Sequence, residues 1–364
     1  MSLDVEAGLV ALLQQIVDIE SVSGNERELA DAVELTLRSH PHLDVERDGD
    51  CVVARTQLGR GERVVIAGHL DTVPVADNLP SSLEEHAEGL RVVGRGTCDM
   101  KGGVAVMLAL ATELTAPNRD LTWIFYDHEE VDAFRNGLRR LSVNRPELLA
   151  ADFAVLMEPT SAEIEGGCQG TCRIAIAAEG KAAHSARAWM GTNAIHGLGD
   201  VLRRLEEYQP AQVEVDGLVY REGLNAVRIQ GGIAGNVIPP SASVEINYRF
   251  APDKSPDDAL AELRRVFDGY EFELLDMSPG ARPGLDRPLA QQFVAAVGGE
   301  ARPKYGWTDV SRFSALGVPA VNYGPADPLV AHADYEYCPA ADLERCHTGL
   351  IAWLTTTTER EDDR

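Results

Sequence analysis

Residues 64–74 read VVIAGHLDTVP, and this stretch decides the fold. Its first four residues are apolar and mostly β-branched, which predicts a buried strand that ends at Gly68. His69 and Asp71 follow with one residue between them, so both side chains point to the same side of an extended chain. In open α/β sheets, ligands bind at the carboxyl ends of the strands. A metal-bound histidine usually donates its other ring N–H to a carboxylate, and this His-x-Asp triplet supplies both groups.

Two further apolar stretches end in acidic residues. Residues 121–126 (LTWIFY) precede residues 127–130 (DHEE), and residues 153–157 (FAVLM) precede Glu158. Helical patterns separate these strands. We therefore predict a mostly parallel sheet whose carboxyl edge carries a shared cluster of metal ligands or proton-transfer groups.

A glycine-rich stretch, residues 94–103 (GRGTCDMKGG), precedes an apolar helix predicted over residues 104–114. The stretch lacks the spacing and the Gly-Lys-Ser/Thr ending of a phosphate-binding loop, and it contains no GxGxxG motif. We expect its glycines to let the start of the helix pack closely beside the site, to which Asp99 contributes a carboxylate.

The composition is typical of a globular protein, with 45% hydrophobic and 25% charged residues. A chain of 364 residues is longer than one core usually supports, so we expect two domains. A formal net charge of −25 repels phosphates and disfavours nucleic acids or an anionic membrane as partners. The six cysteines form no CxxC pair, and the sequence shows neither a signal peptide nor a membrane span, so we expect a cytoplasmic protein.

The hydrophobic pattern changes near residue 172 and returns to its earlier form near residue 286. Between these positions the order is strand–helix–strand–strand–helix–strand, without acidic strand ends. The predicted fold is an α/β domain with a mostly parallel sheet flanked by helices, interrupted by an inserted α+β sandwich. The predicted boundaries are 1–171 and 286–364 for the α/β domain and 172–285 for the insert.

Several local expectations follow from shorter patterns. Asn25 is the expected N-cap of the second helix, and residues 75–89 are expected to form a polar loop. In the insert, one amphipathic helix is predicted over residues 194–205. Residues 324–337 are expected to form a loop, and residues 359–364 are expected to fray.

The strand ends and the late loop together supply two imidazoles and three carboxylates, a set that suits Zn²⁺ and admits Co²⁺ or Mn²⁺. The candidate ligands are His69, Asp99, Glu130, Glu158 and His332. His69 would pair with Glu158 on one ion. His332 would pair with Glu130 on a second ion, and Asp99 would bridge the two. Two metals about 3.5–4 Å apart polarise a carbonyl and activate water, and Glu129, beside a ligand, would then face the water as general base.

In this order and at this spacing, the motifs resemble the zinc aminoacylase/carboxypeptidase family of di-metal amidohydrolases over nearly the whole chain. The matching stretches are GHLDTVP from Gly68, GRGTCDMKGG from Gly94, the Glu129-Glu130 pair, Met157-Glu158-Pro159 and His332. The resemblance implies that the five candidate ligands bind the metals, that Asp71 orients His69 and that Glu129 is the general base. It also implies a cis peptide bond between Asp99 and Met100.

One segment departs from the family pattern. Residues 131–135 (VDAFR) are bulkier and more charged than the small residues usual after the Glu pair, which leaves the conformation of this loop open. His128 precedes the pair, but strand alternation directs it away from Glu129, so we leave it out of the site.

Three other stretches, residues 76–80, 184–191 and 235–240, resemble one branch of the family whose members hydrolyse N-succinyl-LL-2,6-diaminopimelate. The resemblance implies that the insert is a lid through which relatives form homodimers. His184 matches a lid histidine that reaches the neighbouring subunit's active site and stabilises the oxyanion. The matching substrate-facing positions are Asn236 and Arg249 in the lid and Thr308 after it.

The sequence leaves other substrates open, namely acetylornithine, another N-acyl amino acid or a dipeptide. A third alternative is a catalytically silent metal-binding protein, against which the intact Glu129 argues. The diaminopimelate substrate carries three carboxylates, so this acidic chain must supply local cations. Arg187, Arg249 and Arg312 are the candidates, because a guanidinium can bind a carboxylate through two hydrogen bonds.

Overall fold

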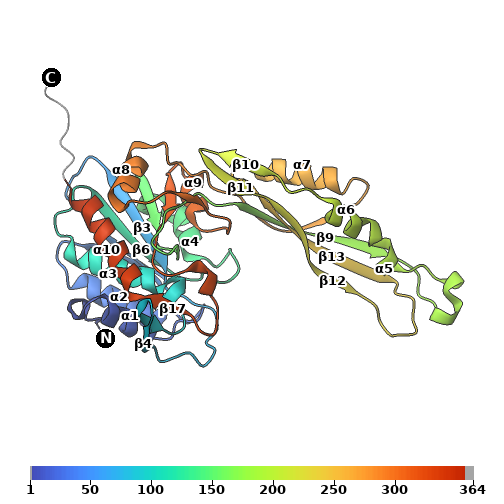
Figure 1. Ribbon diagram of the computed structural model, residues 1–364, viewed down its shortest axis with the longest axis horizontal. Helices are drawn as coiled ribbons and strands as arrows, with labels where there is room; N and C mark the ends of the chain where they lie inside the picture. The colour runs from blue at the N-terminus through green and yellow to red at the C-terminus, as the bar shows by residue number, and fades with distance from the viewer. Residues whose placement is uncertain (1, 357–364) are drawn as a thin grey trace, which may run out of the picture. The chain divides into compact units, whose positions relative to one another are not determined.

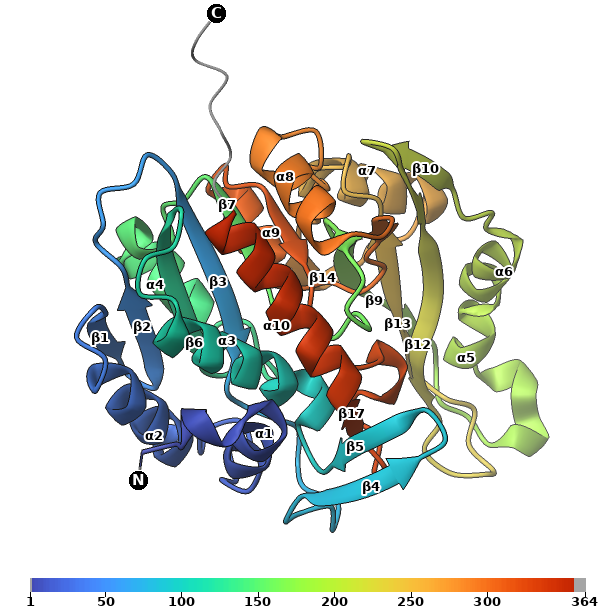
Figure 2. The same ribbon diagram turned by 60° about the vertical axis from the view of Figure 1, so that its left-hand side comes forward.

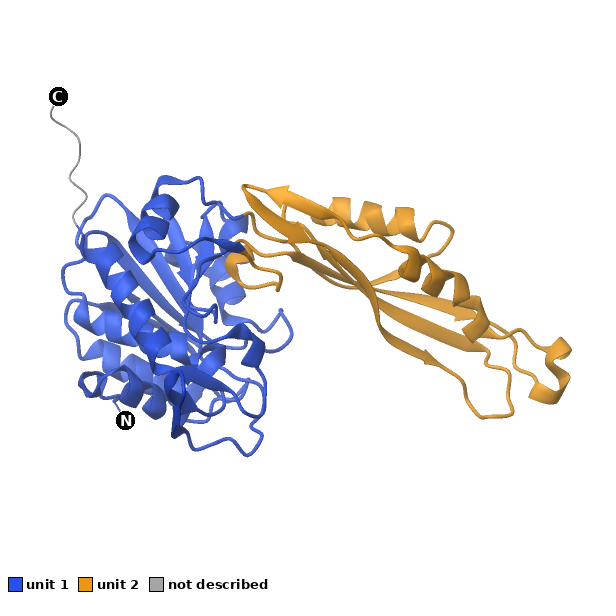
Figure 3. Cartoon of the chain, in the orientation of Figure 1, with its two compact units in different colours: residues 1–166, 283–302, 312–364 blue, residues 167–282, 303–311 orange. Residues whose placement is uncertain are grey.

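The computed structural model describes residues 2–356 and divides them into two compact units (Figure 3). Unit 1 comprises the chain up to residue 166, residues 283–302 and the chain from residue 312. Unit 2 comprises residues 167–282 and 303–311. The predicted fraying of residues 359–364 lies outside the described residues.

The unit boundaries differ from the predicted ones most clearly at residues 303–311, which the sequence placed in the α/β domain. These residues join unit 2 because their hydrogen bonds lead there. The backbone N–H of Gln169 donates to the carbonyl of Lys304 at 3.2 Å. The Ser311 hydroxyl and the Trp307 indole N–H both donate to the Pro279 carbonyl, at 2.7 and 3.0 Å.

The central sheet confirms the predicted mostly parallel arrangement. Its strand order is β1-β2-β6-β3-β7-β16-β8-β15, and the four strands β6, β3, β7 and β16 are mutually parallel. The bounds are β1 Asp44–Asp48, β2 Cys51–Arg55, β3 Arg63–His69, β6 Asp120–Tyr126, β7 Phe153–Leu156, β8 Glu165–Gly166, β15 Arg302–Pro303 and β16 Ala320–Asn322. In the register, Ala67 of β3 lies beside Ile124 on one side and Leu156 on the other, so the three carboxyl ends meet at one edge.

Helices cover both faces of this sheet (Figures 1 and 2). Their bounds are α1 Leu9–Val17, α2 Arg27–Arg38, α3 Gly102–Glu113, α4 Gly137–Asn144, α8 Pro288–Val297, α9 Val310–Ala315 and α10 Ala340–Thr355. The largest core joins apolar residues of α1, α2, α3, α8 and α10 to one face of the sheet, where Val64 and Ile66 of β3 are fully buried. At Gly103, a Cβ would lie 2.2 Å from the Met157 carbonyl, so glycine does let α3 begin against the end of β7, as predicted.

Two local predictions for unit 1 are wrong. Residues 75–89 are not all loop, because β4 (Ser82–His86) pairs with β5 (Gly89–Val93), which also pairs with β17 (Tyr337–Pro339). Every residue of β4 is exposed, so no apolar alternation marks it as a strand. The N-cap of α2 is Glu26 rather than Asn25, whose backbone N–H donates to Val22 in a preceding turn.

Unit 2 is built on a four-stranded antiparallel sheet of order β12-β13-β9-β14, backed by a separate hydrophobic core. The strands are β9 Gly170–Glu179, β12 Gly223–Gly231, β13 Ser241–Phe250 and β14 Glu273–Ser278, and the helices are α5 Ala194–Gly197, α6 Gly199–Glu207 and α7 Pro256–Val266. The single helix predicted over residues 194–205 is thus split at Leu198. The predicted element order also missed a hairpin, β10 (Gln212–Val215) and β11 (Leu218–Arg221). Among the described residues, no helix combines the length and apolarity that a membrane crossing requires.

Candidate metal centre and active site

His69 ends β3 and is almost completely buried. Its Nδ1 lies 3.0 Å from the backbone oxygen of Asp71 and 3.4 Å from the Oδ1 of the same residue. Its Nε2 lies 3.1 Å from Oδ1 of Asp99. Asp71 therefore contacts one ring nitrogen, and the other nitrogen points into the acidic cluster.

Asp99 lies between two imidazoles. Its Oδ1 faces Nε2 of His69 at 3.1 Å, and its Oδ2 faces Nε2 of His332 at 3.4 Å. Burial opposes ionisation of this carboxyl, but the hydrogen bonds with His332 and His69 hold its pKa well below the usual range. The peptide bond between Asp99 and Met100 is cis, as predicted from the family resemblance.

His332 lies in the late loop, with a left-handed backbone φ of 65° and a half-exposed side chain. Its Nε2 lies 2.9 Å from Oε1 of Glu130. Hydrogen bonds with Asp99 and Glu130 raise the pKa of His332 to about 10, although burial acts in the opposite direction. Residues more than 200 positions apart in the chain are thus joined at one point.

The donor set fits divalent metal ions. His69, Asp99 and Glu130 each offer a ligand atom within 4.8 Å of the others, and His332 contacts two of these three residues. Imidazole and carboxylate donors suit Zn²⁺, and a carboxylate that turns one oxygen to each of two imidazoles suits a bridging position. Glu158, the fifth predicted ligand, is buried directly after Met157, whose N–H donates to β3 at Ala67.

Asp71 also organises the loop that carries the Glu pair. Its Oδ1 accepts the backbone N–H of Glu129 at 2.9 Å, and its Oδ2 accepts that of Glu130 at 3.0 Å. The Ser23 hydroxyl donates to Oδ2 at 2.6 Å. Although burial opposes ionisation, hydrogen bonds from His69 and Ser23 help to lower the pKa of Asp71 to about 2.

Sequence reasoning missed the two residues that fix the backbone of Asp99, Glu336 and its partner Arg95. Glu336 is buried, and its Oε1 accepts the backbone N–H groups of Cys98 and Asp99, both at 3.0 Å. Its Oε2 accepts a hydrogen bond from the buried Arg95 guanidinium at 2.9 Å. A carboxylate that binds backbone N–H groups 237 and 238 positions away leaves no periodic signal in the sequence.

The predicted lid residues lie in unit 2, in two groups. His184 and Asn236 lie on paired segments, because His184 bridges Val237 and the N–H of Ser185 donates to the Asn236 carbonyl at 2.9 Å. Arg187 follows on the same segment, and all three predicted residues there are exposed.

The second group lies at the opposite end of the β12-β13-β9-β14 sheet of unit 2. Arg249 of β13 pairs with Thr171 of β9, and its guanidinium Nε donates to Oδ1 of Asn247 at 3.1 Å. Thr308 is buried, with its carbonyl 3.7 Å from the Cys168 thiol.

Metal binding should release protons near neutral pH. At about pH 7.5 the His332 imidazole, with its pKa of about 10, carries a proton that a metal must displace. Burial disfavours the charged form of His69, but hydrogen bonds with Asp71 and Asp99 outweigh burial and raise its pKa well above the usual value. Both rings bind a metal only after losing a proton, so metal affinity should rise with pH and fall as the pH is lowered.

Calorimetric titration with Zn²⁺ in two buffers of different ionisation enthalpy measures this release, and we expect about one to two protons per chain at about pH 7.5. His332→Ala should remove about one of them, whereas the exposed His196→Ala in unit 2 should change nothing. Equal heats in both buffers would contradict the assignment of charged imidazoles at this site.

Comparisons with known proteins place this site in a family. The model of peptidase family M20/M25/M40 matches residues 65–356. A protein of Mycobacterium tuberculosis that carries the provisional name succinyl-diaminopimelate desuccinylase DapE is 52% identical over 344 residues, which cover 94% of this chain and 96% of that protein. The succinyl-diaminopimelate desuccinylase of Corynebacterium glutamicum is 45% identical, with 94% of each chain covered. Among solved structures, the Bacillus subtilis YXEP protein, a dinuclear metal binding peptidase from the M20 family, superposes with a TM-score of 0.69 at 17% identity, covering 96% of this chain and 97% of that one.

Proposed function

The chain belongs to peptidase family M20/M25/M40, and on this premise we propose that it hydrolyses N-succinyl-LL-2,6-diaminopimelate to succinate and LL-2,6-diaminopimelate. The observation that carries the proposal is its 52% and 45% identity, over 94% of the chain, to two relatives named for this activity. Within the family, the chain is a metal-dependent hydrolase of amide bonds. The reaction places it in the supply of lysine and cell-wall precursors.

The proposed cofactors are two Zn²⁺ ions, with Co²⁺ or Mn²⁺ as substitutes. His69 and Glu158 would hold one ion, Glu130 and His332 the other, and Asp99 both. The position of the Asp99 carboxylate between two Nε2 atoms supports this assignment, as does the dinuclear site named for the Bacillus subtilis neighbour. When bound, such ions polarise the amide carbonyl and make water more acidic.

Glu129 is the proposed general base. It accepts a proton from the water whose oxygen adds to the succinyl carbonyl carbon, and it returns a proton to the nitrogen as the C–N bond breaks. The Asp71 carboxylate supports this role, because its two oxygens fix the backbone of Glu129 and of the adjacent ligand Glu130. Neighbouring glutamates on a fixed backbone can serve two different atoms, one a metal and one a water.

Unit 2 is the proposed lid and dimerisation domain, through which two copies of the chain associate. Strand β12 lies at the edge of its sheet, and Val227 and Ile229 on this strand are 56% and 53% exposed. An unpaired strand edge with exposed apolar side chains is typical of an association surface. We propose that His184 from the lid of one subunit stabilises the oxyanion in the active site of the other.

Substrate carboxylates require cations, and the contacts favour Arg249. Its guanidinium is half-buried, and burial lowers its pKa. Its terminal nitrogens form no ion pair or hydrogen bond within the described part of the chain. Arg187, Asn236 and Thr308 are the other proposed substrate-binding residues. Nucleic acids and membranes are not proposed partners. A cytoplasmic location agrees with the six cysteines, all unpaired in the described chain.

A substrate panel tests the proposal. The purified protein with added Zn²⁺ is assayed with N-succinyl-LL-2,6-diaminopimelate, N-acetylornithine, another N-acetyl amino acid and a dipeptide. We expect kcat/KM to be at least about tenfold higher for the succinyl substrate, since a site built for its carboxylates leaves polar groups unpaired with the others. Preference for acetylornithine or a dipeptide would replace the proposed substrate, and hydrolysis of none by the metal-loaded protein would favour the silent alternative.

A further inference from the structure

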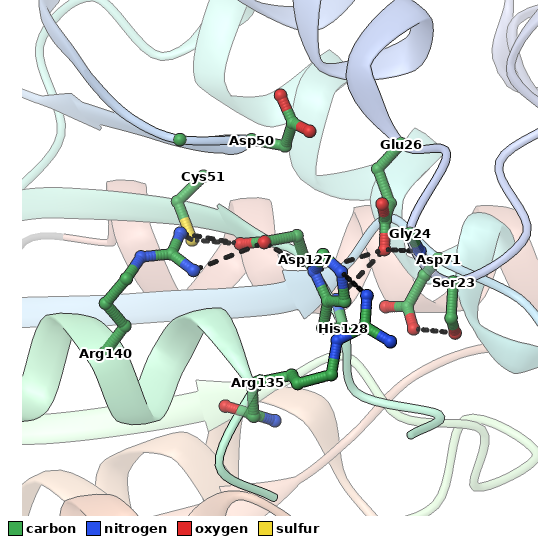
Figure 4. A network of polar contacts seen from close by, with 12 residues as sticks. Ser23, Gly24, Glu26, Asp50, Cys51, Asp71, Asp127, His128, Arg135 and Arg140 are labelled. Carbon is green, nitrogen blue, oxygen red and sulfur yellow. Dashed lines mark hydrogen bonds and ion pairs between the residues drawn. The ribbon is translucent and has the colours of Figure 1, made fainter. Parts of the chain in front are cut away.

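The loop that carries the Glu pair is held by two buried carboxylates rather than one. Three successive backbone N–H groups are bound in turn. Those of Glu129 and Glu130 donate to Asp71, and that of His128 donates to Oε1 of Glu26 at 3.2 Å. Figure 4 shows the side chains of Glu26 and Asp71 near His128, which begins this loop.

Besides the His128 N–H, the Glu26 carboxylate contacts the N–H of Gly24 and, at 3.5 Å, Nδ1 of the His128 ring. Glu26 is fully buried at the N-cap of α2, yet it makes no capping hydrogen bond to the helix. Its Oε1 accepts the N–H of Gly24 at 2.8 Å in addition to that of His128, and its Oε2 is buried without a hydrogen-bond partner in the described structure. Burial raises the pKa of Glu26, and the charge of Asp71 adds to this effect. A carboxylate kept at this cost to stability needs a local reason.

The His128 ring shows that the loop is fixed on its other side too. Arg135 donates to Nε2 of His128 at 2.8 Å, so Nδ1 carries the proton and donates to Oδ2 of Asp127 at 2.6 Å. Asp127 in turn accepts hydrogen bonds from Cys51 and Arg140, both at 2.9 Å (Figure 4). These contacts hold His128 at a left-handed φ of 59°. Segment 131–135, which departs from the family pattern, thus supplies the arginine that fixes this ring.

The short turn of residues 23–26 is connected to both carboxylates. Its Ser23 hydroxyl donates to Asp71, and its own Glu26 accepts the hydrogen bond from the loop. Arg135 also lies against this turn, since its Nη2 would be 3.2 Å from a Cβ placed on Gly24. Residues 23–26 are therefore bound to residues 127–135, the segment that contains Glu129, the proposed general base.

We propose that Glu26 is a positioning residue for the general base. Its hydrogen bond to the His128 backbone sets the direction in which the Glu129 side chain points. The inference rests on the proposed role of Glu129. It assigns Glu26 no contact with substrate or metal. Because misplacing a catalytic group by about 1 Å can cost roughly 10² in rate, a hydrogen bond at this position has a measurable consequence for kcat.

The test compares Glu26→Ala with Glu26→Gln. The alanine variant loses the acceptor, so we expect kcat to fall about 10- to 100-fold, with KM and the number of bound Zn²⁺ ions unchanged. The glutamine variant keeps an oxygen at Oε1, and we expect kcat within about threefold of the wild type. Glu28→Gln, an exposed glutamate one residue into the same helix, is the matched control and should leave kcat unchanged.

Three results would overturn the proposal: no change in kcat for Glu26→Ala, loss of metal in that variant, or a glutamine variant as slow as the alanine one. The last would mean that the charge of Glu26, rather than its hydrogen bond, matters. If Glu26→Ala fails to fold, Arg135→Ala tests the same contact between residues 23–26 and 127–135, since Arg135 is exposed. This variant should lower kcat about three- to tenfold at unchanged KM and metal content. All variants are assayed with whichever amide substrate the wild type hydrolyses best, so failure of the proposed substrate is seen in the wild type alone.

Discussion

Glu129→Gln is expected to lower kcat by roughly 10²–10⁴ while the metal content of the protein stays unchanged. Glutamine matches glutamate in size and still forms hydrogen bonds, but it does not accept a proton from water at neutral pH. The backbone that positions it is held by Asp71, and the substitution leaves that contact in place. KM should change little, because the lost interaction is made while the proton moves rather than when substrate binds. Steady-state kinetics and metal analysis of the same preparation provide the measurement.

Two further variants serve as comparisons for this measurement. Glu130→Gln should lose metal, because Glu130 faces His332 within the candidate metal site. Asp132→Asn, on an exposed side chain of the same loop, should leave both kcat and metal content unchanged. If Glu129→Gln loses metal and Glu130→Gln keeps it, the two roles are reversed.

The fold was predictable where burial leaves a periodic or continuous apolar pattern. Strands β3, β6 and β7 are apolar runs covered on both faces, so each one is visible in the sequence without any knowledge of its neighbours. The same burial explains why their ends meet, because parallel strands of one sheet present their carboxyl ends at one edge. The strand-end residues His69, Glu130 and Glu158 could therefore be predicted from the sequence to share one cluster.

Strands without a buried face could not be predicted in this way. The side chains of β4 are all exposed, and the strand is held only by backbone pairing with β5. Hairpin β10–β11 was likewise missed. Only Val215 and Tyr220 are buried on these two short strands, so the pattern is too brief to stand out.

Long-range hydrogen bonds from backbone N–H groups to carboxylates were the second class of feature that could not be predicted from the sequence. Glu26 binds a loop 102 positions away, and Glu336 binds one 237 positions away. The partner in each case is a main-chain group that every residue except proline possesses, so the identity of the partner residue carries no information. Such contacts position the site, yet they exist only in the folded structure and leave no pattern in the sequence.

His184 has a side chain suited to stabilising negative charge. It is exposed on unit 2, and its Nδ1 accepts the backbone N–H of Ala186 at 3.1 Å, so in the neutral ring Nε2 carries the proton. Every candidate metal ligand belongs to unit 1. If His184 acts on the oxyanion, as we propose, His184→Ala should lower kcat by about 10²–10³, or roughly 3–4 kcal/mol, with metal content unchanged.

Mixing His184→Ala subunits with Glu129→Gln subunits decides whether His184 acts across a dimer. If it acts in the partner's site, a mixed dimer carries both lesions in one site and none in the other, so activity returns. Random exchange should then restore about a quarter of wild-type activity, because half the dimers are mixed and one of their two sites is intact. If His184 acts within its own subunit, every site keeps one lesion and the mixture stays as slow as its parents. Native mass spectrometry must first confirm exchange, and a mixture of His184→Ala with wild type controls for changes caused by dilution alone. An exchanged but inactive mixture would reject the shared site and leave His184 with a role inside its own chain or in the lid structure.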